Sequence, residues 1–115
     1  MSIKIYHNPR CSKSRKALEL LEQQGLNPEI VKYLDTPPDE NELRNIIRQL
    51  GVAARDLLRK GEEEFKLAGL SDENLDDDTV IKAMLAFPKL IERPIVIHGN
   101  KAIIGRPPEK VLDII

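Results

Sequence analysis

The order of segments in the first third of the chain limits its fold most strongly. Residues 3–6 alternate apolar and polar side chains at the period of a β-strand, and residues 29–33 also have a strand-like pattern. Between them, residues 12–24 carry apolar side chains at helical spacing, and Gly25 stands where a helix commonly ends. A strand–helix–strand unit of this length predicts two parallel strands joined by a right-handed crossover.

The middle of the chain has a helical pattern. One helix is expected to open with Thr36 as its capping residue and to end at Gly51. A short helix should follow, and another should run from about residue 77 to residue 87, with acidic side chains that complement the dipole of its first turn. These segments predict a helical insert at about residues 38–88.

The C-terminal part returns to β-structure. Residues 94–98 and 101–104 have strand patterns around a tight Gly99-Asn100 turn, and a short apolar helix closes the chain. The element order is therefore β-α-β, helical insert, β-β-α, an α/β fold with a mixed four-stranded sheet. Because the chain has 115 residues, 41% of them hydrophobic, we expect one domain over residues 1–115.

Composition excludes several kinds of partner. A net charge of -1 and only 3% aromatic residues argue against nucleic-acid binding. No apolar run approaches the length of a membrane helix, so we expect no membrane partner. One cysteine and two distant histidines make no usual metal-ligand set. Because a single cysteine allows no internal disulfide, a cytoplasmic location is expected.

Cys11 is the most informative residue, because it lies between the first strand and the first helix. A helix N-terminus presents unpaired N–H groups and partial positive charge, which stabilise a thiolate and could also hold an oxyanion. Further positive charge is expected from neighbouring side chains, namely His7, Arg10, Lys13 and Arg15. We therefore predict that Cys11 is a nucleophile with a lowered pKa.

Two familiar cysteine chemistries fail on spacing. A redox C-x-x-C pair would need a second cysteine at the position of Ser14. A low-molecular-weight phosphatase loop would need an arginine six positions after the cysteine, where this chain has Ala17. Any redox cycle at Cys11 must therefore use a thiol from another molecule.

The segment His7-Asn8-Pro9-Arg10-Cys11-Ser12-Lys13-Ser14-Arg15 resembles the active-site loop of the glutaredoxin-coupled arsenate reductase (ArsC) family. The likeness continues in order through residues 33–38, 57–60, 92–96 and 104–108, and ends at residues 111–114. It implies a thioredoxin-like fold with a helical insert. The chain is similar to a short subgroup, and Arg10 stands where some members have a small residue.

The resemblance also implies a reaction. The Cys11 thiolate attacks arsenate, glutathione then attacks the adduct, and glutaredoxin resolves the mixed species to release arsenite. The expected partners are therefore arsenate or a similar oxyanion, glutathione and glutaredoxin. No bound cofactor is expected, since glutathione acts as a reducing co-substrate.

Individual residues carry over from the family to this sequence. Arg59, Arg93 and Arg106 match its oxyanion-binding arginines, and a guanidinium can donate two hydrogen bonds to such an anion while staying charged. His7 matches a histidine thought to lower the thiol pKa, and Ser14 matches a serine whose hydroxyl is expected to bond the thiolate. Pro94 matches the cis-proline of thioredoxin-like folds, which would aim Arg93 at the thiol and expose backbone to a glutathione-like peptide.

Two other functions stay open. A glutathione-dependent thiol transferase would need Cys11 but not the three arginines. A non-enzymatic regulator like the Spx-type relatives would share the fold, although those proteins typically carry the C-x-x-C pair that Ser14 removes here.

Overall fold

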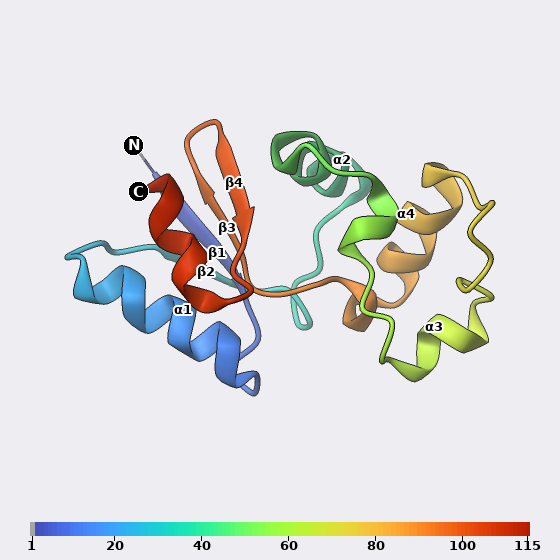
Figure 1. The fold of residues 1–115 in the computed structure, drawn as a ribbon, viewed down its shortest axis with the longest axis horizontal. Coiled ribbons are helices and arrows are strands. Elements are labelled where there is room, and N and C mark those ends of the chain that lie inside the picture. The colour runs from blue at the N-terminus through green and yellow to red at the C-terminus, as the bar shows by residue number, and fades with distance from the viewer. Residues whose placement is uncertain (1) are drawn as a thin grey trace. The chain divides into compact units, whose positions relative to one another are not determined.

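A computed structural model describes residues 2–115 and divides them into two compact units. The first contains the chain up to Thr36 together with Arg93–Ile115, and the second contains Pro37–Glu92. The second unit begins and ends close to the helical insert expected at about residues 38–88. Figure 1 shows that the first unit holds all four strands and the second is helical. A single domain over residues 1–115 stays a prediction.

The sheet of the first unit confirms the predicted mixed topology. Its strands are β1 (Ile3–His7), β2 (Glu29–Lys32), β3 (Ile95–His98) and β4 (Lys101–Ile104), in the order β2-β1-β3-β4. β1 is parallel to β2 and antiparallel to β3, and β3 is antiparallel to β4. The central strand β1 therefore carries its C-terminal end, and the loop that follows it, into the middle of the unit.

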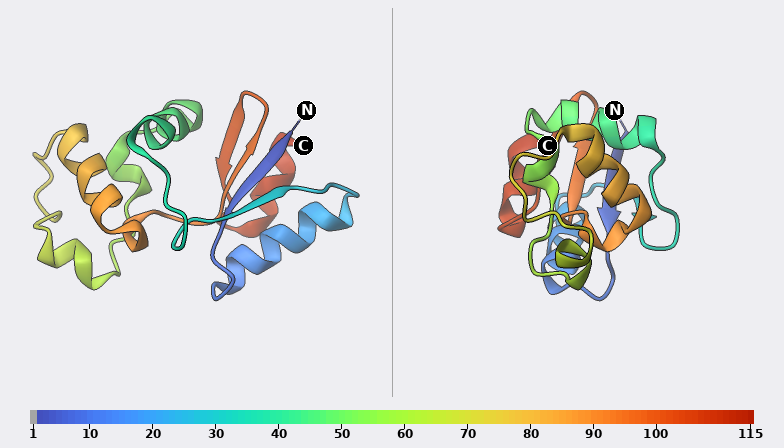
Figure 2. Two further views of the ribbon diagram at one scale, coloured as in Figure 1. Left: turned by 180° about the vertical axis from the view of Figure 1, so that it is seen from behind. Right: turned by 90° about the vertical axis from the view of Figure 1, so that its right-hand side faces the viewer.

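One face of this sheet is covered by two helices. These are α1 (Ser12–Gln23) and the closing 3-10 helix η3 (Pro108–Ile114), which lie on the same side of the sheet in Figure 2. The shared core consists of fully or almost fully buried side chains: Ile3, Ile5, Ala17, Leu21, Val96 and Val111. Burial of these apolar side chains holds α1 and η3 against the sheet.

The helix α2 (Glu40–Leu50) begins later than the sequence predicts. Its capping residue is Asp39, whose carboxylate accepts a hydrogen bond of 2.8 Å from the backbone N–H of Glu42, so the expectation of Thr36 as the cap is wrong. The reason is the Pro37-Pro38 pair, because a proline disfavours helical backbone at the residue before it. The predicted end at Gly51 is confirmed by its left-handed backbone, with φ of 70°.

The rest of the second unit consists of short helices. They are η1 (Ala54–Leu57), α3 (Glu63–Leu67), α4 (Asp77–Ala86) and η2 (Pro88–Leu90). The core of this unit includes buried side chains from α2, η1, α4 and η2: Leu43, Ile46, Leu57, Val80, Met84 and Leu90. Among residues 2–115, no helix has the length and apolar character needed to cross a membrane.

Gly105 joins β4 to the closing segment at a position with no room for a side chain. Its N–H donates a hydrogen bond of 2.8 Å to the Pro94 carbonyl. A Cβ there would lie 2.9 Å from Pro94 Cγ and 3.0 Å from Val111 Cγ1, two atoms that cannot swing away. The packing of Pro94 therefore depends on Gly105.

Gly105→Ala should destabilise the protein by about 1–3 kcal/mol, since overpacking a well-filled core forces side chains and backbone to shift. Gly61→Ala is the matched control, because a Cβ at Gly61 would meet no atom within 4 Å. Urea unfolding of both variants measures the difference. Equal stability of the two variants would contradict this account of the contact.

Candidate active site

Cys11 occupies the capping position at the start of α1. Its backbone is extended, with φ of -93° and ψ of 121°. Its N–H donates to the Asn8 carbonyl at 3.0 Å, and its own carbonyl accepts from the Arg15 N–H at 3.0 Å. The turn after β1 therefore closes on itself and delivers the cysteine directly into the helix.

The capping positions of the three longest helices, α1, α2 and α4, show which side chains a helix N-terminus favours. At the start of α2 and α4, the caps Asp39 and Asp76 are carboxylates that accept from the N–H three residues later. At the start of α1 the corresponding side chain is the thiol of Cys11, and the first turn of α1 contains no acidic residue. Because a helix N-terminus stabilises negative charge, a thiolate fits where the other helices place a carboxylate.

The pKa of the Cys11 thiol is lowered by its surroundings. Burial alone would raise this pKa, but the Ser14 backbone N–H, the Arg93 side chain and the Lys13 backbone N–H together outweigh it. The sulfur makes no hydrogen bond of ordinary cap geometry to the helix, so these groups act as a loose cradle around it. The side chain is partly exposed, which leaves it open to reagents.

Two arginines from the far end of the chain approach this sulfur. Arg93 lies two residues before the start of β3, and its hydrogen bond and charge both lower the Cys11 pKa. Arg106 follows β4, with its Nη2 4.0 Å from Cys11 Sγ, and its Nε donates to the Arg93 carbonyl at 2.9 Å. The structure therefore brings together two of the three arginines that the sequence singled out.

The backbone around these arginines has two cis peptide bonds. Arg93–Pro94 is cis, as the resemblance implies for Pro94, and Arg106–Pro107 is cis as well. Sequence reasoning missed the second bond, although Pro107 follows an arginine just as Pro94 does. Each arginine thus enters the site directly before a cis proline.

His7 and Ser14 form a buried polar cluster behind the cysteine. His7 Nδ1 lies 2.6 Å from Ser14 Oγ, and the Asn8 N–H donates to the same oxygen at 3.1 Å. Burial, then the charges of Lys32 and Arg15, lower the His7 pKa, so the imidazole is expected to be neutral near pH 7. A hydroxyl that accepts from Asn8 can donate its hydrogen to a neutral imidazole nitrogen.

This cluster changes the roles expected of both side chains. The positive charge expected of His7 beside the thiol does not fit a neutral, buried ring. The hydroxyl of Ser14 is engaged with His7 and Asn8, and it is the backbone N–H of Ser14 that lowers the Cys11 pKa. Both side chains are thus tied into the loop that precedes Cys11, and their catalytic importance stays a prediction.

Arg59 belongs to the second unit. Its Nη1 donates to Glu92 at 2.9 Å, and its Nε lies 3.4 Å from Glu62. Beside it, the antiparallel bridge between Leu58 and Ile91 places the Arg59 backbone opposite Leu90, whose carbonyl accepts from the Arg59 N–H at 2.8 Å. Two carboxylates thus fix this guanidinium within its own unit, and its expected contact with the oxyanion stays a prediction.

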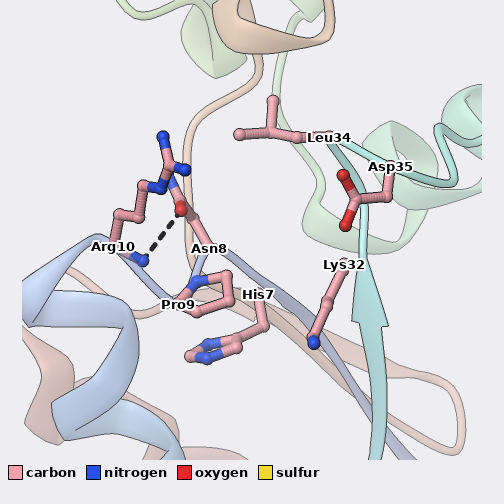
Figure 3. A pocket seen from close by; sticks show the side chains of 7 residues that line it. All are labelled: His7, Asn8, Pro9, Arg10, Lys32, Leu34 and Asp35. Atoms are coloured by element: carbon pink, nitrogen blue, oxygen red, sulfur yellow. Dashed lines mark hydrogen bonds between the residues drawn. The ribbon is translucent and has the colours of Figure 1, made fainter.

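A pocket of about 340 Å³ opens beside the same loop (Figure 3). One wall is the loop of residues 7–10, and the other is formed by Lys32, the last residue of β2, with Leu34 and Asp35 after it. Sequence reasoning missed these three residues, since nothing in a strand end marks a pocket wall. Among residues 2–115, no group of three or more His, Cys, Asp or Glu side chains could hold a metal ion.

Comparison with known proteins decides the family. Residues 6–114 match the ArsC family. The chain belongs to the ArsC family. It is 53% identical over 110 residues to an arsenate reductase of Neisseria meningitidis, covering 95% of this chain and 94% of that one. It is 43% identical over 114 residues to an Escherichia coli arsenate reductase, covering 99% of this chain and 81% of that one.

A solved structure extends this similarity to three dimensions. The solved structure of an arsenate reductase from Vibrio cholerae is 51% identical in sequence and superposes with a TM-score of 0.96. The alignment covers 100% of this chain and 98% of that one. The thioredoxin-like ArsC fold expected from the sequence is therefore confirmed.

Ser14→Ala separates the two roles of this serine. The buried Asn8 N–H and His7 ring would each lose their partner, so stability should fall by about 1–3 kcal/mol. The Cys11 pKa should stay lowered, because it depends on the backbone N–H at position 14. Urea unfolding and pH-dependent alkylation measure the two effects, with the exposed Ser12→Ala as control. A thiol pKa restored to its usual range without loss of stability would contradict this division.

Proposed function

We propose that this ArsC-family protein is an arsenate reductase in which the Cys11 thiolate is the nucleophile. The observation that carries the proposal is the approach of Arg93 and Arg106 to a single thiol at a helix N-terminus. Relatives named arsenate reductase, at about half identity over nearly the full length, support the choice of substrate.

The first step forms a sulfur–arsenic bond. The Cys11 thiolate attacks the arsenic atom, and one arsenate hydroxyl takes up a proton and leaves as water. Arsenate is a tetrahedral anion, so it gains from guanidinium groups that donate paired hydrogen bonds and remain charged. The closeness of Arg93 and Arg106 to Cys11 supports a role for them in holding such oxygens, while the helix N-terminus would stabilise the attacking sulfur.

The second stage transfers two electrons from two external thiols. The glutathione sulfur attacks the arsenic of the adduct, and a second arsenic hydroxyl takes up the thiol proton and leaves as water. The glutaredoxin thiolate then attacks the glutathione sulfur. A disulfide forms between glutathione and glutaredoxin, and the electron pair of the broken sulfur–arsenic bond reduces arsenic to the trivalent state. Water then releases arsenite from Cys11. The single cysteine supports this scheme, because the chain has no second thiol to resolve the adduct.

The cellular setting follows from the same chemistry. A scheme that uses glutathione and glutaredoxin requires a reducing compartment, and the one thiol of this chain must stay reduced between turnovers. We therefore place the protein in the cytoplasm as part of this proposal.

A thiol transferase is the second candidate, and the pairing of Arg59 favours it. Arg59 is held by Glu62 and Glu92, so two of the three predicted arginines contact the thiol and its surroundings. Exchange of glutathione with a protein mixed disulfide would need the reactive Cys11 but no tetrahedral anion site. The two activities differ in how strongly they depend on the arginines.

Cys11→Ser should abolish arsenite production, because a serine hydroxyl is not ionised at neutral pH. Arg93→Ala and Arg106→Ala should each lower kcat/KM for arsenate by about 10- to 100-fold, as expected for loss of hydrogen bonds to a charged group. The kcat/KM of Arg106→Lys for arsenate should lie between the values of the alanine variants and the parent protein. Lysine keeps the positive charge but lacks the paired N–H donors of the guanidinium.

The assay measures arsenite formed with glutathione and glutaredoxin, alongside thiol exchange with a model mixed disulfide. If arsenite forms no faster with the parent protein than without it, the proposed arsenate reductase activity is wrong. Equal losses of both activities in the arginine variants would show that the arginines serve the thiol alone, which favours the transferase.

A further inference from the structure

We propose that the pocket beside Cys11 binds a carboxylate of the thiol substrate and so directs its sulfur to the cysteine. The pocket lies between the loop of residues 7–10 and the C-terminal end of β2 with the residues that follow it, as Figure 3 shows. The identity of this thiol as glutathione rests on the proposed function. The preference of the pocket for a carboxylate-bearing thiol does not depend on it.

The backbone next to Pro94 is the first place where a peptide-like thiol could pair. The backbone carbonyls of Arg93 and Pro94, however, already accept hydrogen bonds within the first unit. The Arg93 carbonyl accepts from Arg106 Nε at 2.9 Å, and the Pro94 carbonyl accepts from the Gly105 N–H at 2.8 Å. The loop that precedes Cys11 offers a separate set of groups that can fix the charged end of such a thiol.

The pocket wall and the nucleophile belong to one closed turn. The Cys11 N–H donates to the Asn8 carbonyl at 3.0 Å, and the Arg10 N–H donates to Asn8 Oδ1 at 3.0 Å. Arg10 lines the pocket, and its Cα is about 3.8 Å from that of Cys11 because the two residues are adjacent. The pocket is therefore built on the loop that carries the reacting cysteine, although Cys11 itself does not line it.

The charges of the pocket suit a small zwitterionic thiol with an excess of carboxylate. Arg10 and Lys32 are exposed cations, Asp35 is the one acidic lining residue, and His7 is neutral for the reasons given above. The lining thus carries one net positive charge. Glutathione has two carboxylates, one ammonium group and one net negative charge, which complements this arrangement.

The volume of the pocket also selects a small molecule. About 340 Å³ lies near the lower end of the range for small-molecule sites, roughly 300–1,000 Å³. Arg93 and Arg106, which approach the thiol, do not line it. An oxyanion on these arginines and a thiol in the pocket therefore use different side chains, as a reaction with two substrates requires.

The test is disulfide exchange in the absence of arsenate. The Cys11 thiolate attacks one sulfur of oxidised glutathione, the old S–S bond breaks, a Cys11–glutathione disulfide forms, and a glutathione thiolate leaves. Mass spectrometry of the full chain gives the rate constant for this adduct. The same measurement with bis(2-hydroxyethyl) disulfide, which has no charge, corrects for any change in the reactivity of the sulfur itself.

Lys32→Gln and Arg10→Gln should each lower the rate with oxidised glutathione by about fivefold, or about 1 kcal/mol, relative to the rate with the uncharged disulfide. Lys101→Gln is the matched control, since Lys101 pairs with His98 at the end of the sheet where β1 begins. This control should leave both rates unchanged.

An unchanged ratio of the two rates in both pocket variants would overturn the proposal. An equal fall in Lys101→Gln would also overturn it, because the effect would then come from the loss of any one positive charge and not from a charge in the pocket. Since arsenate takes no part, a protein that fails to reduce arsenate can still pass this test, and an active arsenate reductase can fail it.

Discussion

The negative charge on one sulfur is the interaction on which the site depends. At the starts of α2 and α4 the corresponding position holds an aspartate, whereas α1 offers its unpaired N–H groups to Cys11. Burial opposes ionisation of this thiol, and the backbone of Ser14 and Lys13 and the Arg93 side chain outweigh that effect. The helix N-terminus thus favours a thiolate at Cys11 without a side-chain cap bond, and a lowered thiol pKa is what the proposed nucleophile needs.

The rest of the first unit serves to keep that sulfur in place. The core between the sheet, α1 and η3 fixes the helix start, while the His7–Ser14–Asn8 cluster fixes the turn before it. Arg106 supports Arg93 through the Arg93 carbonyl, and Gly105 leaves the space that Pro94 fills. Polar and apolar contacts from segments far apart in the sequence thus converge on one reactive atom.

The sequence predicted the strands, the sheet topology and the importance of Cys11, because hydrophobic period and helix-start position are local signals. It missed the start of α2, where Pro38 prevents Pro37 from entering the helix and Asp39 becomes the cap. It also could not show that the Ser14 hydroxyl faces His7, that Arg59 pairs with carboxylates, or that Lys32 borders a pocket. These features depend on contacts between segments that no local pattern encodes.

Direct titration of Cys11 tests the central claim most simply. Thiolate absorbance or the rate of alkylation, followed against pH in the full chain, gives the pKa of its one thiol. The account predicts a pKa below the usual value of about 8.5, and an upward shift when Arg93 is replaced by glutamine. A pKa at or above about 8.5 in the parent protein would contradict it.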